Sequence, residues 1–390
     1  MILWKGMTLI LYIVLSASFI TASTMGVRLL RLLRRFTARQ VPELPPSEDN
    51  LPTVSVCIPA RDEMHAMTRC LEAVIASTYP KLEIIVLDDA SKDNTSILIK
   101  SFAHSGVRFV EGSPLPDGWL GKTHAEHELI REASGDLILF LDVDTHIRPR
   151  TIDTLVALML SENATMVSVM PTRDDVWRSS VLFATLRYFW TIILHRPSLP
   201  SVASSAWLVR RDYLSTQFQN LETLRLTVEP ERLIAAEAAR HNAYRFYVSS
   251  HLIGVSYEKK WRSQLETSIR LLYPSLKGRL IQVAIAYITM GLMLVPFAWV
   301  PTAIILGWHT SHLVAAILSL LMIGVYTLYT TRVWSKGWLI GGVVFPFVLL
   351  QEMYLLTRSV YAYSTRTVTW KGRPIMGSAK AVMRPTKDAV

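Results

Sequence analysis

Two carboxylates separated by one residue, Asp142 and Asp144, follow a continuous apolar run over residues 137–141. An apolar run of this length, bounded by Gly135 and Pro149, is typical of a buried parallel strand. Residues i and i+2 of an extended chain point to the same side, so both carboxylates can face one site at the end of the strand. Such a pair suits a divalent metal, Mg²⁺ or Mn²⁺, that carries phosphate oxygens. The same pattern also fits two aspartates that only solubilise a strand end and begin a turn.

Further polar residues follow two earlier apolar runs, at 54–58 and 83–87. The residues after the first run are Pro59, Ala60, Arg61 and Glu63, and those after the second are Asp88 and Asp89. A guanidinium in this position can bind a diphosphate, and small residues let a nucleotide base approach the backbone. The alternative for Asp88 and Asp89 is a capping role in the next turn, because good turn residues follow them.

Residues 118–122 are predicted to be a loop that leads into a helix. Lys122 and exposed backbone amides at the start of that helix favour an anion such as a diphosphate. An ordinary turn with a packed Trp119 is the alternative. The nearby His124 and His127 do not have metalloprotease spacing and are predicted to lie on an exposed helix face rather than in a zinc site.

Strand-like and helix-like stretches alternate from residue 53 onward and would position these side chains. The predicted strands are 54–58, 83–87, 107–110, 137–141, 165–170, 205–209 and 244–248, and the predicted helices are 64–77, 96–104, 122–133 and 231–240. This alternation predicts an α/β fold with a mostly parallel sheet, helices on both faces, and ligands at the carboxyl ends of the strands. Residues 178–195 are amphipathic and aromatic, which suits either a helix lying on a membrane or a packed core helix.

Three of these motifs together resemble the inverting family 2 glycosyltransferases, which have the GT-A fold. The motifs are Val56–Glu63, Val86–Thr95 and Asp142–Asp144, in the family's order and spacing. Residues 118–125 and 368–373 resemble the bacterial membrane-anchored branch, which includes hopanoid-associated and carotenoid-acid (diaponeurosporenoate-type) glycosyltransferases.

The resemblance implies transfer of a single sugar from a nucleotide diphosphate sugar to a lipid or isoprenoid-like acceptor. It implies a divalent metal, Mg or Mn, held by Asp142 and Asp144. It places nucleotide-sugar contacts at Pro59, Ala60, Arg61, Glu63, Asp88, Asp89, Lys122 and Asp142. Of the two acids after the second strand, Asp89 is expected to contact the base or ribose. Processive members carry a Gln-x-x-Arg-Trp motif near the basic cluster 259–262, and its absence from this chain disfavours polymer synthesis.

The family's general base is a carboxylate from a Glu-Asp pair that opens a helix, and this chain has Glu229-Pro230-Glu231 there. The expected aspartate is Pro230 if Glu229 is aligned, and Glu231 if the helix is aligned. Pro230 suits the first turn of a helix, and acids there interact favourably with the helix dipole, which is also a purely structural role. We expect Glu231 to be the catalytic base and Glu229 its neighbour. The substitution leaves open a catalytically impaired membrane binding or scaffold protein that keeps the fold.

The composition indicates a membrane protein. Hydrophobic residues make up 51% of the 390 residues, and the formal net charge is +10. In an apolar chain this charge is expected to set membrane topology rather than to bind nucleic acid. The chain has two cysteines, Cys57 and Cys70, whose spacing fits neither a disulfide framework nor a zinc site and suits a reducing compartment.

Five parts are predicted along the chain. They are an N-terminal transmembrane anchor (1–27), a basic and proline-rich linker (28–52), a GT-A domain (53–275), about three C-terminal transmembrane segments (276–360) and a basic tail (361–390). Five arginines follow the first apolar segment, which favours an uncleaved anchor over a cleaved signal peptide and places its C-terminal end in the cytoplasm. We therefore expect a multi-pass protein of the plasma membrane with a cytoplasmic catalytic domain.

The C-terminal apolar segments are predicted at 281–300, 303–331 and 338–357. Positive clusters lie on both sides of the last segment, so one straight crossing cannot place both in the cytoplasm. Two arrangements resolve this: Pro346 breaks the last segment into a re-entrant hairpin, or the middle segment, interrupted at 309–312, forms an extra hairpin.

Overall fold

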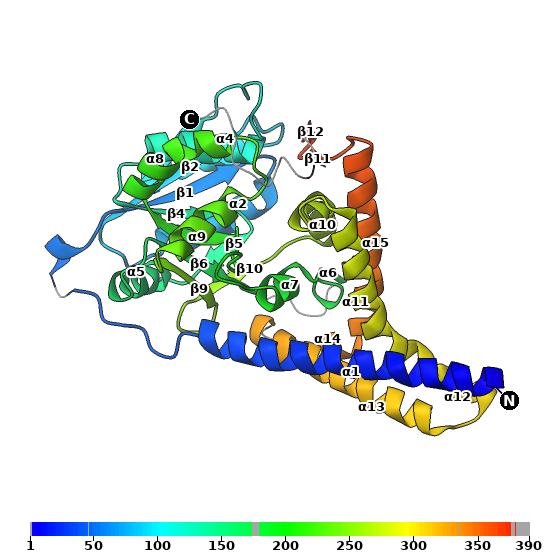
Figure 1. The fold of residues 1–390 in the computed structure, drawn as a ribbon. Helices are drawn as coiled ribbons and strands as arrows, with labels where there is room; N and C mark the ends of the chain where they lie inside the picture. The colour runs from blue at the N-terminus through cyan, green and yellow to red at the C-terminus, as the bar shows by residue number, and fades with distance from the viewer. Residues whose placement is uncertain (1, 46, 174–178, 335, 376–378, 380–390) are drawn as a thin grey trace. The chain divides into compact units, whose positions relative to one another are not determined.

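The chain divides into two compact units, each described here by itself (Figure 1). The computed structural model describes residues 2–45, 47–173, 179–334, 336–375 and 379. The helical unit comprises Met1–Arg35, Asp175–Ile193 and Lys260–Tyr361, and the α/β unit comprises Phe36–Asp174, Leu194–Lys259 and Ala362–Val390. Of the residues expected in the catalytic domain, Asp175–Ile193 and 260–275 cluster with the helical unit, and Ala362–Val390 clusters with the α/β unit.

The α/β unit is built on a sheet whose order, over the described residues, is β3-β2-β1-β4-β8-β6-β9. The strands are β1 (Val54–Ala60), β2 (Leu82–Asp88), β3 (Val107–Glu111), β4 (Leu137–Leu141), β6 (Met166–Met170), β8 (Ala206–Arg210) and β9 (Tyr244–Val248). Strand β8 runs antiparallel to β4 and β6, and the other neighbouring pairs are parallel. The predicted mostly parallel sheet is confirmed.

Two smaller sheets accompany the main one in the α/β unit. The first joins β5 (Thr145–Ile147), β10 (Val255–Tyr257) and β7 (Thr172–Arg173), and the second is a hairpin of β11 (Thr369–Trp370) and β12 (Arg373–Pro374). The helices of this unit are α2 (Met64–Ile75), α3 (Thr95–Ser101), α4 (Gly121–Glu132), α5 (Thr151–Ser161), α8 (Arg211–Phe218) and α9 (Pro230–Arg240), with short 3₁₀ helices at Glu48–Asn50, Ala103–Ser105 and Gln219–Leu224.

Helices cover both faces of the main sheet because alternate strand residues point to opposite sides. Val56 of β1 and Leu139 of β4 belong to one core cluster with Leu71 of α2, and residues of α5 join the same cluster. Cys57, the residue after Val56 in β1, points to the other face of the sheet, where its Sγ lies 3.9 Å from the Leu129 carbonyl oxygen of α4. Because both faces are buried, β4 is apolar throughout and all five of its residues are buried.

The helical unit contains the apolar segments. Its helices are α1 (Ile2–Phe36, which continues one residue beyond the unit), α6 (Ser179–Leu182), α7 (Arg187–Ile193), α10 (Trp261–Ser275), α11 (Leu280–Trp299), η4 (Val300–Thr302), α12 (Ala303–Leu306), α13 (Thr310–Val333), α14 (Trp338–Val343) and α15 (Phe345–Ser364). Three stretches among the described residues are long and apolar enough to cross a membrane: Met7–Phe36, Leu280–Leu306 and Thr310–Val333. Leu15 of α1 packs against Ala315 and Leu318 of α13.

The helix ends differ from the predicted segment boundaries in three places. Helix α1 continues to Phe36, so residues 28–36 of the expected linker are helical. The predicted middle segment 303–331 is broken near Gly307, whose φ of 75° is outside the helical region, and its first part extends the preceding span. The predicted last segment 338–357 is divided at Val344 into α14 and α15, and Pro346, which lacks a backbone N–H, lies in the first turn of α15.

The amphipathic stretch predicted at 178–195 forms the two short helices α6 and α7; residue 178 itself lies outside the described residues. Within the helical unit, Phe189 of α7 is fully buried and makes edge contacts with Tyr326 and Tyr329 of α13. Of the two roles considered for this stretch, α7 therefore has the packed one.

Candidate active site

The loop after β1 is joined to the loop after β2. The two strands are parallel and in register from Val54↔Leu82 to Ala60↔Asp88, so their following residues meet at one edge of the sheet. Arg61, which is 8% exposed, donates from its guanidinium to the carbonyl oxygens of Asp89 and, at 3.2 Å, of Ala90. In the main chain, the Asp89 N–H donates to the Ala60 carbonyl oxygen at 2.8 Å. Arg61 therefore holds the second loop in place.

The two acids after β2 have different surroundings. Asp88 accepts hydrogen bonds from the hydroxyls of Ser91 and, at 2.6 Å, of Ser96, so its carboxylate organises the turn. Asp89 is 3% exposed and accepts a 2.6 Å bond from the Arg373 guanidinium. Burial raises the pKa of Asp89, although Arg373 acts in the opposite direction. Asp88 is thus held by serine hydroxyls in the turn, and Asp89 is the acid held by a distant cation.

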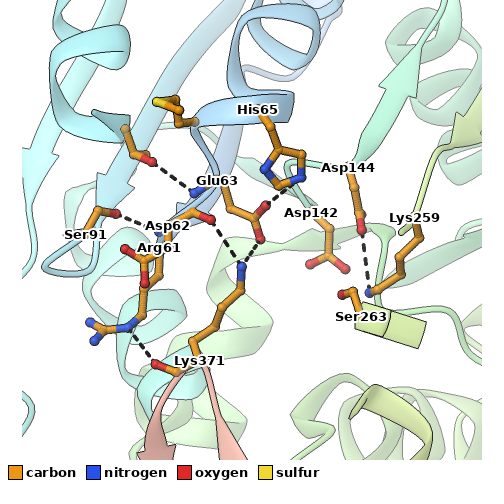
Figure 2. Close-up of polar contacts among 12 residues, drawn as sticks. Arg61, Asp62, Glu63, His65, Ser91, Asp142, Asp144, Lys259, Ser263 and Lys371 are labelled. Carbon is orange, nitrogen blue, oxygen red and sulfur yellow. Dashed lines mark hydrogen bonds and ion pairs between the residues drawn. The ribbon is translucent and has the colours of Figure 1, made fainter. Parts of the chain in front are cut away.

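Asp142 and Asp144 follow β4 and are drawn on one side of the chain in Figure 2. Between them, Val143 is buried, but this stretch is a turn rather than the expected extended strand, because the Thr145 N–H donates to the Asp142 carbonyl oxygen at 2.9 Å. The Lys122 ammonium lies 2.6 Å from Asp142 Oδ1, and the Lys259 ammonium lies 3.6 Å from Asp144 Oδ2. The close lysine on Asp142 and the distant one on Asp144 make Asp144 the more available metal ligand.

The chemistry of this pair fits a divalent cation that shares its ligands with a substrate. No group of three or more His, Cys, Asp or Glu side chains that could hold a metal occurs among the described residues. Mg²⁺ and similar hard cations are commonly held by one or two carboxylates and complete their coordination with phosphate oxygens and water. Asp142 and Asp144 supply the two carboxylates, so a phosphate-bearing ligand would have to supply further oxygens.

Lys122 connects the aspartate pair to the beginning of α9. The N-terminal turn of α4 is tied to the segment before α9, because Leu120 N–H donates to the Arg225 carbonyl at 2.9 Å and Thr123 Oγ1 donates to the Thr227 carbonyl at 2.9 Å. Burial by itself would lower the pKa of Lys122, but the carboxylates of Asp142, Glu126 and Glu231 together raise it above its usual value. Lys122 is therefore a protonated cation among acids.

Glu229 and Glu231 occupy the start of α9, where Pro230 is the first helical residue. Glu229 is paired with Arg232, whose Nε and Nη2 lie 2.9 and 2.8 Å from Glu229 Oε2. Glu231 is 2% exposed. Burial, reinforced by repulsion from Glu229, raises the pKa of Glu231 to about 7 in spite of the nearby Lys122.

The hairpin of β11 and β12 brings two cations into this region that were not predicted from the sequence motifs. Lys371 Nζ lies 2.7 Å from Glu63 Oε1 and Arg373 Nη1 lies 2.6 Å from Asp89 Oδ2. The resemblance of residues 368–373 to a family branch was the available signal, but it did not place them. Glu63 also contacts His65 at 3.8 Å, and burial raises its pKa although Lys371 opposes that shift.

One expectation near the site is wrong. His124 was predicted on an exposed helix face, yet it is 5% exposed and its ring lies 5.3 Å from that of Trp119. The reason is that α4 packs against the segment 219–224, so the helix has little free surface on that side. The other predicted binding residues, Pro59 and Ala60, lie at the end of β1 beside Arg61.

Comparisons with known proteins agree with this architecture. The sequence model of the family described as "Glycosyl transferase family 2" matches residues 55–218. A probable glycosyltransferase, YdaM, of Bacillus subtilis is 34% identical over 110 residues, which are 27% of this chain and 26% of that protein. A 4,4'-diaponeurosporenoate glycosyltransferase of Staphylococcus aureus is 30% identical over 125 residues, 31% of this chain and 32% of that protein. These alignments thus span about a third or less of each relative.

A solved structure extends the likeness to most of the chain. The mannosyltransferase PcManGT from Pyrobaculum calidifontis, in complex with GDP-Man and Mn²⁺, superposes with a TM-score of 0.56 at 18% identity. The superposition covers 87% of this chain and 98% of that one. At this identity the likeness establishes a shared fold.

Proposed function

We propose, from the premise that this chain contains a family 2 glycosyltransferase domain with the GT-A fold, that it moves one sugar from a nucleotide diphosphate sugar to a lipid-like acceptor. The family match covers the loops after β1, β2 and β4, which carry Arg61, Asp89, Asp142 and Asp144. We propose that the acceptor oxygen attacks the anomeric carbon on the face opposite the leaving diphosphate, a single displacement that inverts this carbon. The solved neighbour binds GDP-Man and Mn²⁺, and we extend this donor type and cofactor type to the present chain.

The observation that carries the proposal is the electrostatic link through Lys122. Its ammonium is 2.6 Å from Asp142 and is also influenced by Glu231, so the metal-binding pair and the buried acid belong to one cluster. A general base works best when its pKa is near the working pH, and the pKa of Glu231 is about 7. Glu229 is the weaker candidate because Arg232 holds its carboxylate.

The reaction needs two things from the site: neutralisation of the negative charge on the leaving diphosphate, and removal of the proton of the acceptor hydroxyl. A divalent metal bound by Asp142 and Asp144 would neutralise the leaving diphosphate. Glu231 accepts the proton of the acceptor hydroxyl while that oxygen bonds to the anomeric carbon and the sugar–phosphate bond breaks. Lys122 keeps the site from becoming too negative when Glu231 and Asp142 are both ionised. Arg61 and Asp89 form the nucleotide end of the site, with Pro59 and Ala60 leaving room for the base.

The acceptor is proposed to be lipid-like or isoprenoid-like for two reasons. Among the residues that the structure describes, three helices are long and apolar enough to cross a membrane, which would keep the enzyme where such acceptors are dissolved. One relative is named a 4,4'-diaponeurosporenoate glycosyltransferase, and we extend an isoprenoid-like acceptor type from it to this chain. We further propose a multi-pass protein of the plasma membrane whose α/β unit is in the cytoplasm, because α1 ends with a cluster of arginines.

The alternative, a binding or scaffold protein that retains the fold, is favoured by one feature, the Glu-Pro-Glu sequence where the family has Glu-Asp. The two functions are separated by measuring nucleotide release from UDP- and GDP-linked sugars in the presence of Mn²⁺ and a membrane lipid extract. Release that requires the lipid extract supports the transferase, and NMR of the glycolipid reports the anomeric configuration. Donor binding without release under every condition would support the scaffold.

A further inference from the structure

The β11–β12 hairpin approaches the nucleotide end of the site from the far end of the chain. It is a tight hairpin whose two turn residues, Lys371 and Gly372, have φ values of 47° and 77°. This geometry matches the primed turns that suit antiparallel strands, and glycine adopts it without strain. Lys371 is separated from its partner Glu63 by 308 positions, so the contact is purely tertiary.

The hairpin is seated closely on the first turn of α4. A Cβ atom added to Gly121 would lie 2.9 Å from the Trp370 ring and 3.0 Å from the Arg373 guanidinium. The Lys371 carbonyl oxygen accepts a 3.4 Å bond from Arg61 Nε, so the nucleotide-binding arginine also holds the turn (Figure 2). The backbone of the hairpin is therefore set in position, while the lysine side chain keeps its rotatable stem.

The partners of the two hairpin cations are acids that the function needs. Lys371 pairs with Glu63, which is close enough to the metal-binding Asp144 for the two carboxylates to repel each other. Arg373 pairs with Asp89, the acid expected at the base or ribose. Because a doubly charged diphosphate attracts an ammonium more strongly than one carboxylate does, a bound donor would draw Lys371 away from Glu63.

We propose that this hairpin completes the donor site, with Lys371 binding the donor diphosphate and Arg373 acting as a positioning residue that orients Asp89 toward the nucleoside. The inference rests on the proposed function, because it takes the ligand at this edge of the sheet to be a nucleotide diphosphate sugar. It adds two residues from the C-terminal tail, distant in sequence from the family match at residues 55–218. In this arrangement the C-terminal tail contributes to binding of the donor.

The test compares nucleoside diphosphates with nucleosides on the full-length protein in lipid nanodiscs. UDP and GDP, each with Mn²⁺, and uridine and guanosine are titrated by competition against a fluorescent nucleotide. Lys371→Met should weaken binding of the preferred diphosphate by about 10- to 100-fold, as for loss of a hydrogen bond to a charged group, and leave nucleoside binding unchanged. Lys371→Arg should restore diphosphate binding. Arg373→Met should weaken the nucleoside and the diphosphate together.

Arg366→Gln is the matched control, since it removes an equal charge from the same tail at an exposed position outside the hairpin. It should leave both affinities and the melting temperature unchanged. If Lys371→Met binds the diphosphate more tightly than wild type, the hairpin obstructs the donor. If it binds the diphosphate as tightly as wild type, Lys371 has only a structural role. Either result overturns the inference while the proposed function stands. A wild-type protein that binds neither UDP nor GDP overturns both.

Discussion

The pH dependence of turnover is the sharpest test of the assignment of Glu231 as base. Its pKa of about 7, raised by burial and by Glu229, means that the carboxylate is half ionised near neutral pH. Only the ionised form can accept the acceptor's proton, so turnover at saturating donor should rise with pH and level off above about pH 7. Below that value each unit of pH should reduce turnover about tenfold.

Replacement by glutamine separates this effect from others. Glu231→Gln keeps the shape of the side chain and removes its basicity, so donor binding should persist while turnover falls by about 10²- to 10⁴-fold and loses its pH dependence. Glu229→Gln is the matched control, because it removes the charge that raises the pKa of Glu231. In this variant the pH profile of turnover should shift toward lower pH, and turnover should fall less than in Glu231→Gln. If Glu231→Gln retains near-normal turnover and Glu229→Gln does not, the base is Glu229. If both retain turnover, the base lies elsewhere.

The raised pKa of Glu231 also makes the stability of the fold depend on pH, and stability should fall with rising pH where turnover rises. The folded-state pKa of Glu231 lies above its ordinary value of 4.5, so the folded protein binds this proton more tightly than the unfolded chain. Its contribution to folding is therefore full below about pH 4.5 and is lost as pH rises to about 7. A shift of this size corresponds to about 3 kcal/mol at most. Glu231→Gln should accordingly melt higher than wild type at pH 8 and similarly at pH 4.5; a lower melting temperature at pH 8 would contradict the buried-acid account.

Three further outcomes are expected. Asp144→Asn should abolish metal-dependent nucleotide binding without changing the melting temperature, and calorimetry showing unchanged donor affinity with Mn²⁺ present would exclude Asp144 as a ligand. Protease added to intact cells should not cleave near residue 100, because the α/β unit is proposed to be cytoplasmic; cleavage with the membrane sealed would reverse that orientation. Gly342→Ala should destabilise the helical unit by about 1–3 kcal/mol, since its Cβ would meet Thr327 Oγ1 at 2.0 Å, whereas Gly324→Ala, with no atom within 4 Å, should not.

Local patterns were sufficient to predict the elements of the α/β unit. The apolar run before Asp142 predicted a strand buried on both faces, but the extended geometry expected for Asp142 and Asp144 was wrong, because a turn follows Leu141. Pro230, which suits the first turn of a helix, predicted the start of α9. These features depend on backbone sterics and on apolar periodicity, which act over a few residues and can be read without knowing the fold. The bounds of the apolar segments were predicted less well, because helix breaks near Gly307 and Val344 interrupt runs that are uniformly apolar in composition.

The partners of the acids could be found only from the tertiary structure. Sequence motifs singled out both Asp88 and Asp89. Only the folded chain shows that serine hydroxyls donate hydrogen bonds to Asp88, and that Arg373, 284 positions away, pairs with Asp89. Glu229 and Glu231 are equally acidic in sequence and both are buried; their difference arises because Arg232 pairs with Glu229, whereas burial and repulsion from Glu229 raise the pKa of Glu231. By itself, the sequence determined which residues can carry charge and which way they point along a strand or helix. Folding decided which opposite charges meet and which carboxylate loses its water, because burial and Coulomb interactions depend on distance in space rather than along the chain.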